Sequence, residues 1–249
     1  MGANQEDFQI AGETPDLLVV EKPAGLLVHP TKPGGPRTLW DGLRELLSYE
    51  LASGGQVSLV NRLDRETSGL VLVAKNPRAA RTAAMAMQNG GIGKTYLALV
   101  AGHPGRESFT VDAPIVRQGA VMDSRIHLKR MVHPAGARAV TEFRVLRRFE
   151  NRLGAFSLVE ARPLTGRTHQ IRVHASHAGH WVVGDKIYGP DEGCYLEFVE
   201  TGWTPALAGR LHMDRHALHS AGLALNWEGH RLEWQSGLPR DMRDFWGEA

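Results

Sequence analysis

Runs of apolar residues predict several short strands in the first third of the chain. Residues 17–30 (LLVVEKPAGLLVHP) contain two runs rich in Leu and Val, joined by the turn sequence PAG, and predict strand, turn, strand. The apolar runs at residues 57–60 (VSLV) and 69–75 (GLVLVAK) flank a polar segment, residues 61–69, and predict strands buried on both faces. The polar segment is therefore expected at the edge of a sheet, beside the core.

Four later segments alternate between apolar and polar residues and are also typical of strands. Residues 139–149 (AVTEFRVLRRF) and 156–164 (FSLVEARPL) look like a pair, because residues 151–154 offer a short turn between them. Residues 94–102 (KTYLALVAG) and 218–227 (LHSAGLALNW) predict one further strand each.

Three segments show the pattern of helices. In residues 38–51 (TLWDGLRELLSYEL), apolar residues recur at helical spacing after Thr38 and Asp41, which could cap the first turn. Residues 78–88 are rich in Ala and are followed by the terminator sequence NGG. Residues 168–179 (THQIRVHASHAG) predict a third helix that ends at a glycine.

The order of these elements indicates the fold class. Strands outnumber helices and come in runs, so we expect an α+β fold on a largely antiparallel or mixed sheet. The Pro/Gly loop at residues 30–36 lies too near the N-terminus to link two domains, and no repeat is visible. We therefore predict a single domain over residues 1–249, with residues 1–15 as a short N-terminal extension.

Length and composition are those of a globular protein. The 249 residues, 42% of them apolar, suffice to bury a sizeable core. The single cysteine, Cys194, permits no intramolecular disulfide, and no apolar run approaches the roughly 20 residues of a membrane span. The first residues carry acids and lack the order of a secretory signal, so a cytoplasmic location without membrane attachment is expected.

The net charge of +2 does not by itself indicate a nucleic-acid partner, but its distribution is uneven. Residues 125–152 hold eight Lys or Arg against Glu142 and Glu150, a local charge of +6, whereas residues 185–200 are acidic. Such polarity suits a polyanion bound to one face. The alternative is a solvated strand face that is rich in arginine.

Several kinds of chemistry find weak support. Two groups of three histidines have spacings that could hold a metal ion, but the first lacks cysteines or acids and the second runs into a predicted strand that would separate its members. The groups are His174, His177 and His180, and His212, His216 and His219. Ser68 lacks the flanking glycines of a nucleophile elbow. A glycosidase needs two carboxylates, and only Asp64 stands out.

Asp64 lies between Arg62 and Arg65 in the polar segment NRLDRETSG. In a turn, this arrangement is typical of a solvated ion pair of little energetic value. A lone ionised carboxylate can also attack an anomeric carbon, or remove a proton beside it, if water is excluded and a cation keeps it charged. Arg172, three residues after His169 on a predicted helix, is a candidate cation, and a surface salt bridge is its alternative role.

Six motifs, in order over about 200 residues, resemble the RluA family of pseudouridine synthases. They are KPAGLLVHP, RLDRETSGL, KTYLALVAG, LTGRTHQIRVHASHAG, GDKIYG and RHALHSAGL. The resemblance implies a pseudouridine synthase-like fold and a catalytic aspartate, which falls on Asp64. It also implies a tyrosine that stacks on the target base, Tyr96, and an arginine that pairs with the aspartate, Arg172. Arg62 would displace or hold the flipped nucleotide.

The sequence departs from the family pattern in two respects. Asn61 stands where the family usually has histidine, and its amide cannot titrate near neutrality. The small RNA-binding module that precedes the catalytic domain in several members is also expected to be missing. Asn61, Thr67 and Gln170 are expected to support the site without touching the RNA, and Lys22 and Asp185 are left between a structural and a supporting role.

The resulting prediction is an isomerase that acts on specific uridines of structured RNA, either tRNA or rRNA, after flipping the base from its stack. No cofactor and no metal is expected, because neither redox chemistry nor hydrolysis occurs. DNA and membrane partners are not expected, and the protein is predicted to be a monomer. Asp64 could act as nucleophile or as base. A non-catalytic RNA-binding or chaperone protein and a metal-dependent hydrolase are the alternatives.

Overall fold

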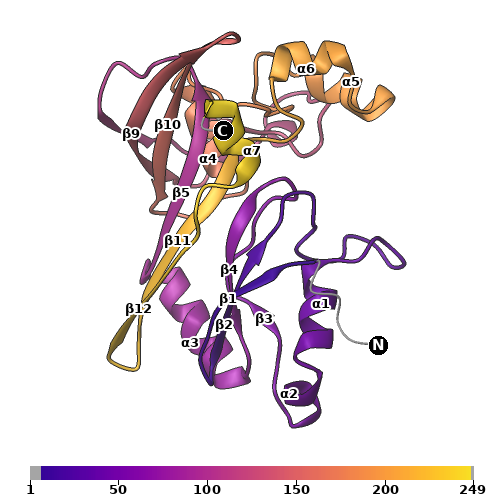
Figure 1. The fold of residues 1–249 in the computed structure, drawn as a ribbon, viewed down its shortest axis with the longest axis vertical. Helices are drawn as coiled ribbons and strands as arrows, with labels where there is room; N and C mark the ends of the chain where they lie inside the picture. Colours follow the sequence, from indigo (N-terminus) through magenta and orange to yellow (C-terminus); the bar gives the residue numbers. More distant parts are fainter. Residues whose placement is uncertain (1–6, 248–249) are drawn as a thin grey trace. The chain divides into compact units, whose positions relative to one another are not determined.

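The computed structural model describes residues 7–247, which form two compact units. The described part of unit 1 comprises residues 7–95 and 219–238, and that of unit 2 comprises residues 96–218 and 239–247. Strands β5 (Ile92–Ala101) and β11 (Leu218–Trp227) each continue from one unit into the other along the chain (Figure 1). A single domain over the whole chain stays a prediction, and residues 1–6 of the expected N-terminal extension lie outside the described residues.

Unit 1 contains a mixed sheet with the strand order β1-β2-β4-β11. Strand β3 pairs with β4, β12 pairs with β11, and the pairing of β4 with β11 is parallel while the other pairings are antiparallel. These strands are β1 (Gln9–Glu13), β2 (Leu17–Lys22), β3 (Ser58–Leu59), β4 (Ser68–Ala74) and β12 (His230–Gln235).

The core of unit 1 is built around β4, in which every residue is buried. This confirms the predicted strand at residues 69–75, which is covered on both faces. In the other predicted run, residues 57–60, only Ser58–Leu59 form a strand, and both residues are half-buried. The buried cluster combines side chains of β2, β4, β11 and the helix α3 (Pro77–Gln88). Its members include Leu17, Val19, Leu70, Leu72, Ala79, Ala83, Leu223 and Leu225.

The first predicted helix forms with the predicted cap. Thr38 accepts a hydrogen bond from the Asp41 backbone N–H, and the Asp41 carboxylate accepts one from the Thr38 N–H, so α1 (Leu39–Leu46) begins with a capping box. The expected single helix breaks at Leu47, which ends α1 and precedes α2 (Ser48–Ala52).

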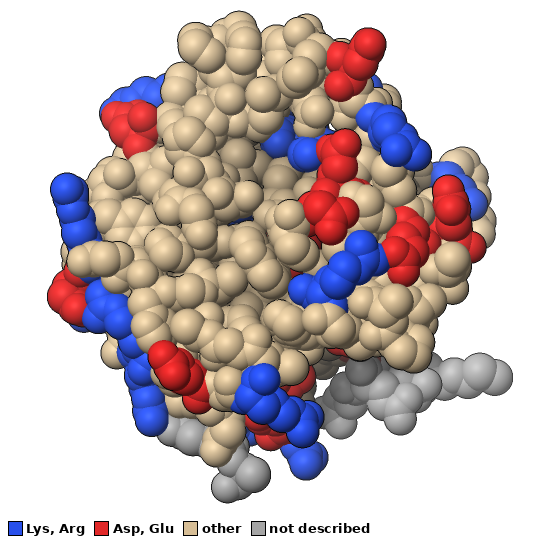
Figure 2. Space-filling model, turned by 90° about the horizontal axis from the view of Figure 1, so that it is seen from above, with Lys and Arg blue, Asp and Glu red and all other residues tan. Residues whose placement is uncertain are grey.

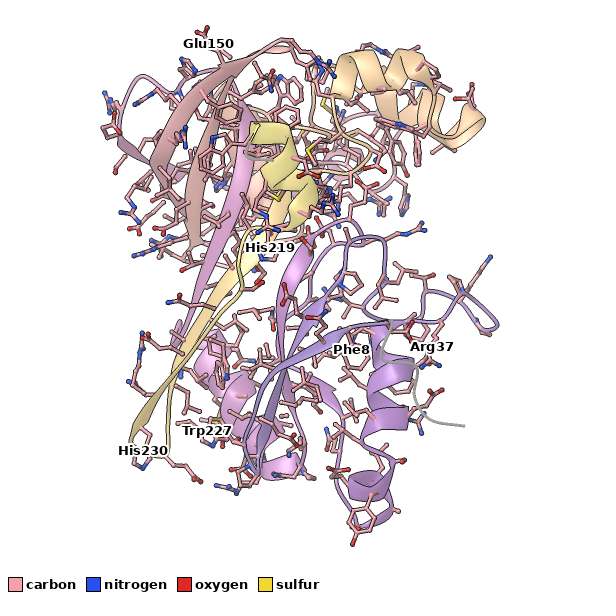
Figure 3. All side chains as sticks on the ribbon, in the orientation of Figure 1. Phe8, Arg37, Glu150, His219, Trp227 and His230 are labelled. Carbon is pink, nitrogen blue, oxygen red and sulfur yellow. The ribbon has the colours of Figure 1, made fainter. Side chains whose placement is uncertain are left out.

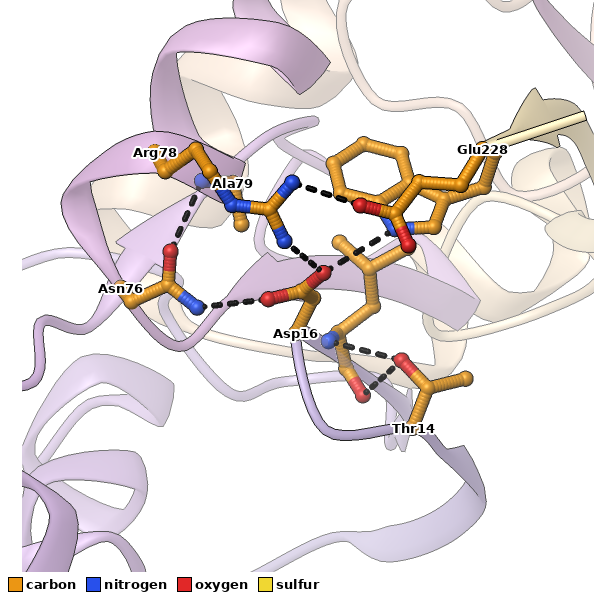
Figure 4. A network of polar contacts seen from close by, with 8 residues as sticks. Thr14, Asp16, Asn76, Arg78, Ala79 and Glu228 are labelled. Atoms are coloured by element: carbon orange, nitrogen blue, oxygen red, sulfur yellow. Dashed lines mark hydrogen bonds and ion pairs between the residues drawn. The ribbon is translucent and has the colours of Figure 1, made fainter.

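Helix α3 is fixed at its start by a polar network (Figure 4). The Asn76 side chain caps the helix, and its amide donates to Asp16 over 2.8 Å. Asp16 also accepts from Arg78 at 2.6 Å and from the Trp227 indole at 3.3 Å. The network joins the residue before β2, the start of α3 and the last residue of β11. It therefore links these three elements of unit 1.

One predicted strand is wrong. Residues 26–29, after the turn in residues 17–30, are not in a strand. The carbonyls of Leu27 and Val28 accept from Leu39 N at 2.8 Å and Trp40 N at 3.1 Å, at the start of α1. The backbone carbonyls of this apolar run thus bond to the start of a helix instead of to a neighbouring strand. The periodicity of the sequence cannot distinguish these two outcomes.

Unit 2 contains an antiparallel sheet in the order β5-β10-β9-β6. The predicted pair is confirmed as the hairpin of β9 (Val140–Asn151) and β10 (Gly154–Pro163). The third predicted helix is confirmed as α4 (Gln170–His177). The remaining elements were not predicted: β6 (Ser108–Asp112), β7 (Ile115–Arg117), η1 (Gln118–Ala120), β8 (Arg130–Val132), α5 (Gly193–Thr201), α6 (Pro205–Leu211) and α7 (Arg240–Trp246).

Helices combined with a mixed, mainly antiparallel set of strands confirm the α+β class. Within residues 7–247, the helices are all too short or too polar to traverse a lipid bilayer.

Candidate functional site

Asp64 lies in the loop between β3 and β4, as the sequence predicts. It is half-buried, while Arg62 and Arg65 on either side are exposed. The Thr67 backbone N–H donates to the Asp64 carbonyl over 3.1 Å, which closes a turn around the acid. Thr67 is itself buried, so the loop passes from solvent into the core within three residues of Asp64.

Asn61 anchors the start of this loop. It is buried, its amide donates to Leu70 O over 3.2 Å, and its carbonyl accepts from Leu72 N over 2.7 Å. The amide thus supplies one donor and one acceptor to the edge of β4, as a paired strand residue would. Asn61 thus supports the loop structurally, and its expected supporting role in the site stays a prediction.

The middle of the loop is tied to the turn that follows β2. Lys22 is fully buried, and its ammonium donates to Pro23 O, Leu26 O and Arg65 O over 2.7, 2.9 and 3.1 Å. The Gly25 N–H also donates to Arg65 O, over 2.8 Å. Lys22 therefore holds the backbone next to Asp64.

The end of the loop joins a chain of hydrogen bonds on β11 and β12. Ser68 Oγ lies 2.9 Å from His219 Nδ1, and His219 Nε2 lies 2.9 Å from Ser236 Oγ (Figure 3 labels His219). Ser236 donates in turn to Glu21, over 2.5 Å. His219 is thus engaged by hydroxyl groups at both ring nitrogens.

His174, from the other group of histidines considered as metal ligands, is also held by protein atoms. The two ring nitrogens of His174 lie 2.9 Å from Thr141 Oγ1 and 2.9 Å from Ala113 O, and burial lowers the pKa of this imidazole. In the part of the chain that the structure describes, three or more His, Cys, Asp or Glu side chains are nowhere grouped so as to hold a metal ion.

Arg172 lies on α4 and forms an ion pair with Asp185, for which the sequence left a structural and a supporting role open. Its Nε donates to Asp185 Oδ2 over 2.6 Å and its Nη2 to Asp185 Oδ1 over 2.8 Å. The Arg172 side chain is 5% exposed and that of Asp185 is fully buried. Burial raises the pKa of Asp185, but the charge and hydrogen bonds of Arg172 outweigh it and hold this pKa at about 2.

Gln170 fixes the start of α4. Its carbonyl accepts from Thr165 Oγ1 over 2.7 Å and from Arg167 N over 2.9 Å, and its amide donates to Val140 O over 2.9 Å and Thr141 Oγ1 over 3.0 Å. All of its hydrogen-bonding capacity is used for packing α4 against β9 and the preceding loop. These contacts are structural, and its expected supporting role in the site stays a prediction.

Tyr96 lies on β5, opposite Ala161 of β10, and is 8% exposed. Tyr96, Gln170 and Arg172 belong to unit 2, whereas Asn61, Arg62, Asp64 and Thr67 belong to unit 1. The predicted contact between Asp64 and Arg172 stays a prediction.

Two aromatic residues near these groups were not predicted. Tyr188 lies beside Arg172, with the guanidinium carbon 5.0 Å from the ring centre. In unit 1, His29 interacts with Arg62: burial lowers the pKa of His29 and the charge of Arg62 lowers it further. Both belong to motifs that the family resemblance quoted, GDKIYG and KPAGLLVHP, but their residue types alone carried no specific signal.

The basic region at residues 125–152 is partly neutralised. Among the described residues, Arg125, Arg138 and Arg152 form no ion pair, and all three are exposed. Other members are paired: Lys129 with Glu192, Arg144 with Glu160, and Arg148 with Glu107. On the face seen in Figure 2, acidic and basic side chains are interspersed. A strongly polarised surface is therefore not visible on that face.

Comparisons with known proteins give a consistent result. Residues 16–177 match the family model described as RNA pseudouridylate synthase, a span that includes Asp64, Tyr96 and Arg172. The chain is 41% identical over 228 residues to a protein of Chloroflexus aurantiacus named as an uncharacterized RNA pseudouridine synthase, covering 89% of this chain and 63% of that protein.

The chain is also 35% identical over 241 residues to ribosomal large subunit pseudouridine synthase D of Zymomonas mobilis, covering 95% of this chain and 71% of that protein. It thus spans about two thirds of the length of these relatives. The solved structure of human RNA Pseudouridylate Synthase Domain Containing 1 resembles it with a TM-score of 0.73, at 27% identity over 97% of this chain and 88% of that one.

Proposed function

Because the chain belongs to the RluA-type family of RNA pseudouridylate synthases, we propose that it converts uridine to pseudouridine in structured RNA. The observation that carries the proposal is the family match over residues 16–177, which includes the loop that presents Asp64. The reaction is an isomerisation: the bond from the ribose to uracil N1 breaks, the base rotates, and a bond from the ribose to C5 forms. The proton lost from C5 balances the proton gained at N1.

We propose that Asp64 acts at the ribose, that Tyr96 stacks on the uracil, and that Arg172 keeps Asp64 ionised. A nearby guanidinium lowers the pKa of a carboxyl group and offsets the effect of burial. Arg62, exposed beside Asp64, would hold or displace the flipped nucleotide. Flipping costs a few kcal/mol and is least costly in loops, so structured RNA with unpaired uridines is the expected substrate.

Asp64→Asn tests this proposal, because the substitution keeps the size of the side chain and removes its charge. Pseudouridine formation should fall by about 10³-fold or more, as is common when an essential catalytic group is removed, while the Kd for RNA changes little. Asp244→Asn is the matched control, since Asp244 is an exposed acid on α7. Residual turnover above about one thousandth of wild type would exclude Asp64 as the chemical group.

Two roles of Asp64 fit the same chemistry: attack on the anomeric carbon, or removal of the proton on the neighbouring ribose carbon. RNA deuterated at ribose C2′ distinguishes them, because only proton removal breaks that bond. A primary isotope effect on single-turnover rates assigns the base role. Its absence assigns the nucleophilic role, provided that the chemical step limits the rate.

We propose RNA of the large ribosomal subunit as the substrate, because the relative from Zymomonas mobilis is named for that subunit. Transfer RNA is the alternative. Mapping pseudouridines in both RNA classes from cells with and without the gene decides between them. A monomeric state and a cytoplasmic location stay predictions.

A further inference from the structure

Beyond the residues that the family match covers, the structure singles out Asp185, which lies outside the matched span of residues 16–177. We propose that Asp185 is a positioning residue for the isomerisation: it fixes the orientation of the Arg172 guanidinium. The inference rests on the proposed function, since Arg172 matters only if it acts on the reaction.

The ion pair holds the guanidinium by one edge. Nε and Nη2 of Arg172 donate to the two carboxylate oxygens of Asp185, so rotation of the guanidinium group about its bond to the side chain is blocked. A single hydrogen bond would not fix that edge, whereas a bidentate pair does.

Asp185 is itself fixed by the backbone. The N–H groups of Ile187 and Tyr188 donate to its Oδ1 over 3.0 and 3.1 Å. These donors favour the ionised form, in addition to Arg172, and they place the carboxylate at a defined point of the loop. The charge that orients Arg172 is therefore fixed independently of Arg172.

The loop around Asp185 is closely packed at both of its glycines. A Cβ atom at Gly184, where φ is +78°, would lie 1.9 Å from Arg215 O, and one at Gly189 would lie 2.3 Å from Asp185 O. Only glycine fits these positions. The two glycines of the GDKIYG motif thus allow the close packing that holds Asp185 in place.

Tyr188 constrains the guanidinium from its face. The ring centre lies 5.0 Å from the guanidinium carbon of Arg172, within the range of a cation–π contact. Its hydroxyl oxygen lies 2.7 Å from His169 Nδ1 and accepts from Arg130 N over 2.9 Å, and these contacts position the ring. Edge and face of the guanidinium are both fixed, which is the arrangement expected of a charge that must be oriented.

Stability alone does not explain the pair. A buried ion pair costs desolvation of both charges, and well-packed apolar residues at the same positions are often as stable. The requirement for one charge held in one direction accounts for the pair, because a misplacement of about 1 Å at a reacting group can cost about 10²-fold in rate.

Asp185→Asn tests the inference, because it preserves shape and removes the second oxygen acceptor and the charge. We expect kcat for pseudouridine formation at saturating RNA to fall on the order of 10²-fold with Kd for RNA unchanged. In an Arg172→Lys background, which cannot form the bidentate pair, Asp185→Asn should cause little further loss of kcat. Multiplicative losses in the double variant would overturn the inference.

Asp241→Asn is the matched control. Asp241 also accepts a bidentate pair, from Arg215 over 2.5 and 2.8 Å, within the same unit. Breaking that pair should lower stability and leave kcat unchanged. An equal fall of kcat in both variants would assign a general structural role to Asp185 and overturn the inference.

Two measurements keep the inference testable if Asp185→Asn folds poorly. Tyr188→Leu leaves the ion pair and removes the ring beneath the guanidinium. It should lower kcat about fivefold, which corresponds to the loss of a cation–π contact of about 1 kcal/mol. The Nε–H signal of Arg172 in the NMR spectrum should exchange slowly with water in wild type and rapidly in Asp185→Asn. Unchanged kcat in Tyr188→Leu, or an unchanged signal, counts against a fixed guanidinium.

The outcomes separate this inference from the proposed function. If wild type forms no pseudouridine in any RNA tested, the proposed function fails, and the role of Asp185 in that reaction fails with it. If wild type is active and Asp185→Asn retains its kcat, only the inference fails.

Discussion

The loop that presents Asp64 and the centre formed by Arg172 and Asp185 are held in opposite ways. The loop is anchored through its neighbours, by the neutral amide of Asn61 and by the Arg65 carbonyl, which accepts from Lys22. Arg172 is anchored through its own charge, by a buried carboxylate.

The two modes of anchoring allow a fold to fix charged groups without neutralising the carboxylate that is proposed to react. Anchors on neighbouring residues set the position of a carboxylate and leave its ionisation to other groups. An anchor on the charge itself sets direction, and it suits an arginine, which stays protonated. The two regions should therefore respond differently to mutation, pH and salt.

The largest expected effect is that of Arg172→Ala. It leaves Asp185 fully buried without its counter-ion, so the unfolding free energy should fall by about 3 to 5 kcal/mol. The loss should shrink as pH falls, since Asp185 can then bind a proton. Denaturant unfolding at several pH values measures both.

The control is Arg215→Ala. Its partner Asp241 is 45% exposed and can be solvated, so the loss should be smaller, about 1 kcal/mol. Equal losses in the two variants would contradict the special burial of the Arg172 pair.

The next largest effect is expected for Asn61, the neutral anchor of the Asp64 loop. Asn61→Ala leaves Leu70 O and Leu72 N without their side-chain partner at a buried site, and should lower the unfolding free energy by about 2 kcal/mol. Exposed Asn226→Ala should change it by less than about 0.5 kcal/mol. Calorimetry of both variants provides the measurement, and a loss in Asn61→Ala that strengthens with acid would show that the anchor is not neutral.

Low pH should reduce the stabilising contribution of the charged anchor, Asp185, and leave that of the neutral anchor, Asn61, unchanged. The pKa of Asp185 lies at about 2 in the folded protein, below its ordinary value of 3.8. The lowered value stabilises the fold fully above pH 4, and this contribution, on the order of 2 kcal/mol, is lost as pH falls towards 2. Wild type should lose stability more steeply than Asp185→Asn between pH 4 and 2, and parallel curves would refute the assignment.

The smallest expected effect concerns the salt dependence of RNA binding. Arg125, Arg138 and Arg152 form no ion pair among residues 7–247, whereas Arg144 and Arg148 are paired. If an unpaired arginine contacts a phosphate, its change to Gln should reduce the slope of log K against log salt by about 0.7 to 0.9. The paired arginines serve as controls, and an unchanged slope across the panel would place the RNA path elsewhere.

The apolar pattern of the sequence predicts the elements in which periodicity reflects burial. Strands β4, β5, β9, β10 and β11 and helices α1, α3 and α4 lie where the apolar pattern predicts them. The sequence also carried the motifs that mark Asp64, Tyr96 and Arg172, because these residues lie in short, specific stretches. The Thr38 and Asp41 cap was visible for the same reason, since its partners are only three residues apart.

The hydrogen-bond partners of these elements are visible only in the folded structure. The apolar run at residues 26–29 meets a helix start instead of a strand. Ser68 contacts His219, 151 positions later, and Arg172 of α4 pairs with Asp185, 13 positions later. Periodicity records which side of a segment is buried, because burial acts on each residue locally. The choice of partner depends on the packing of distant segments, and no local pattern contains it.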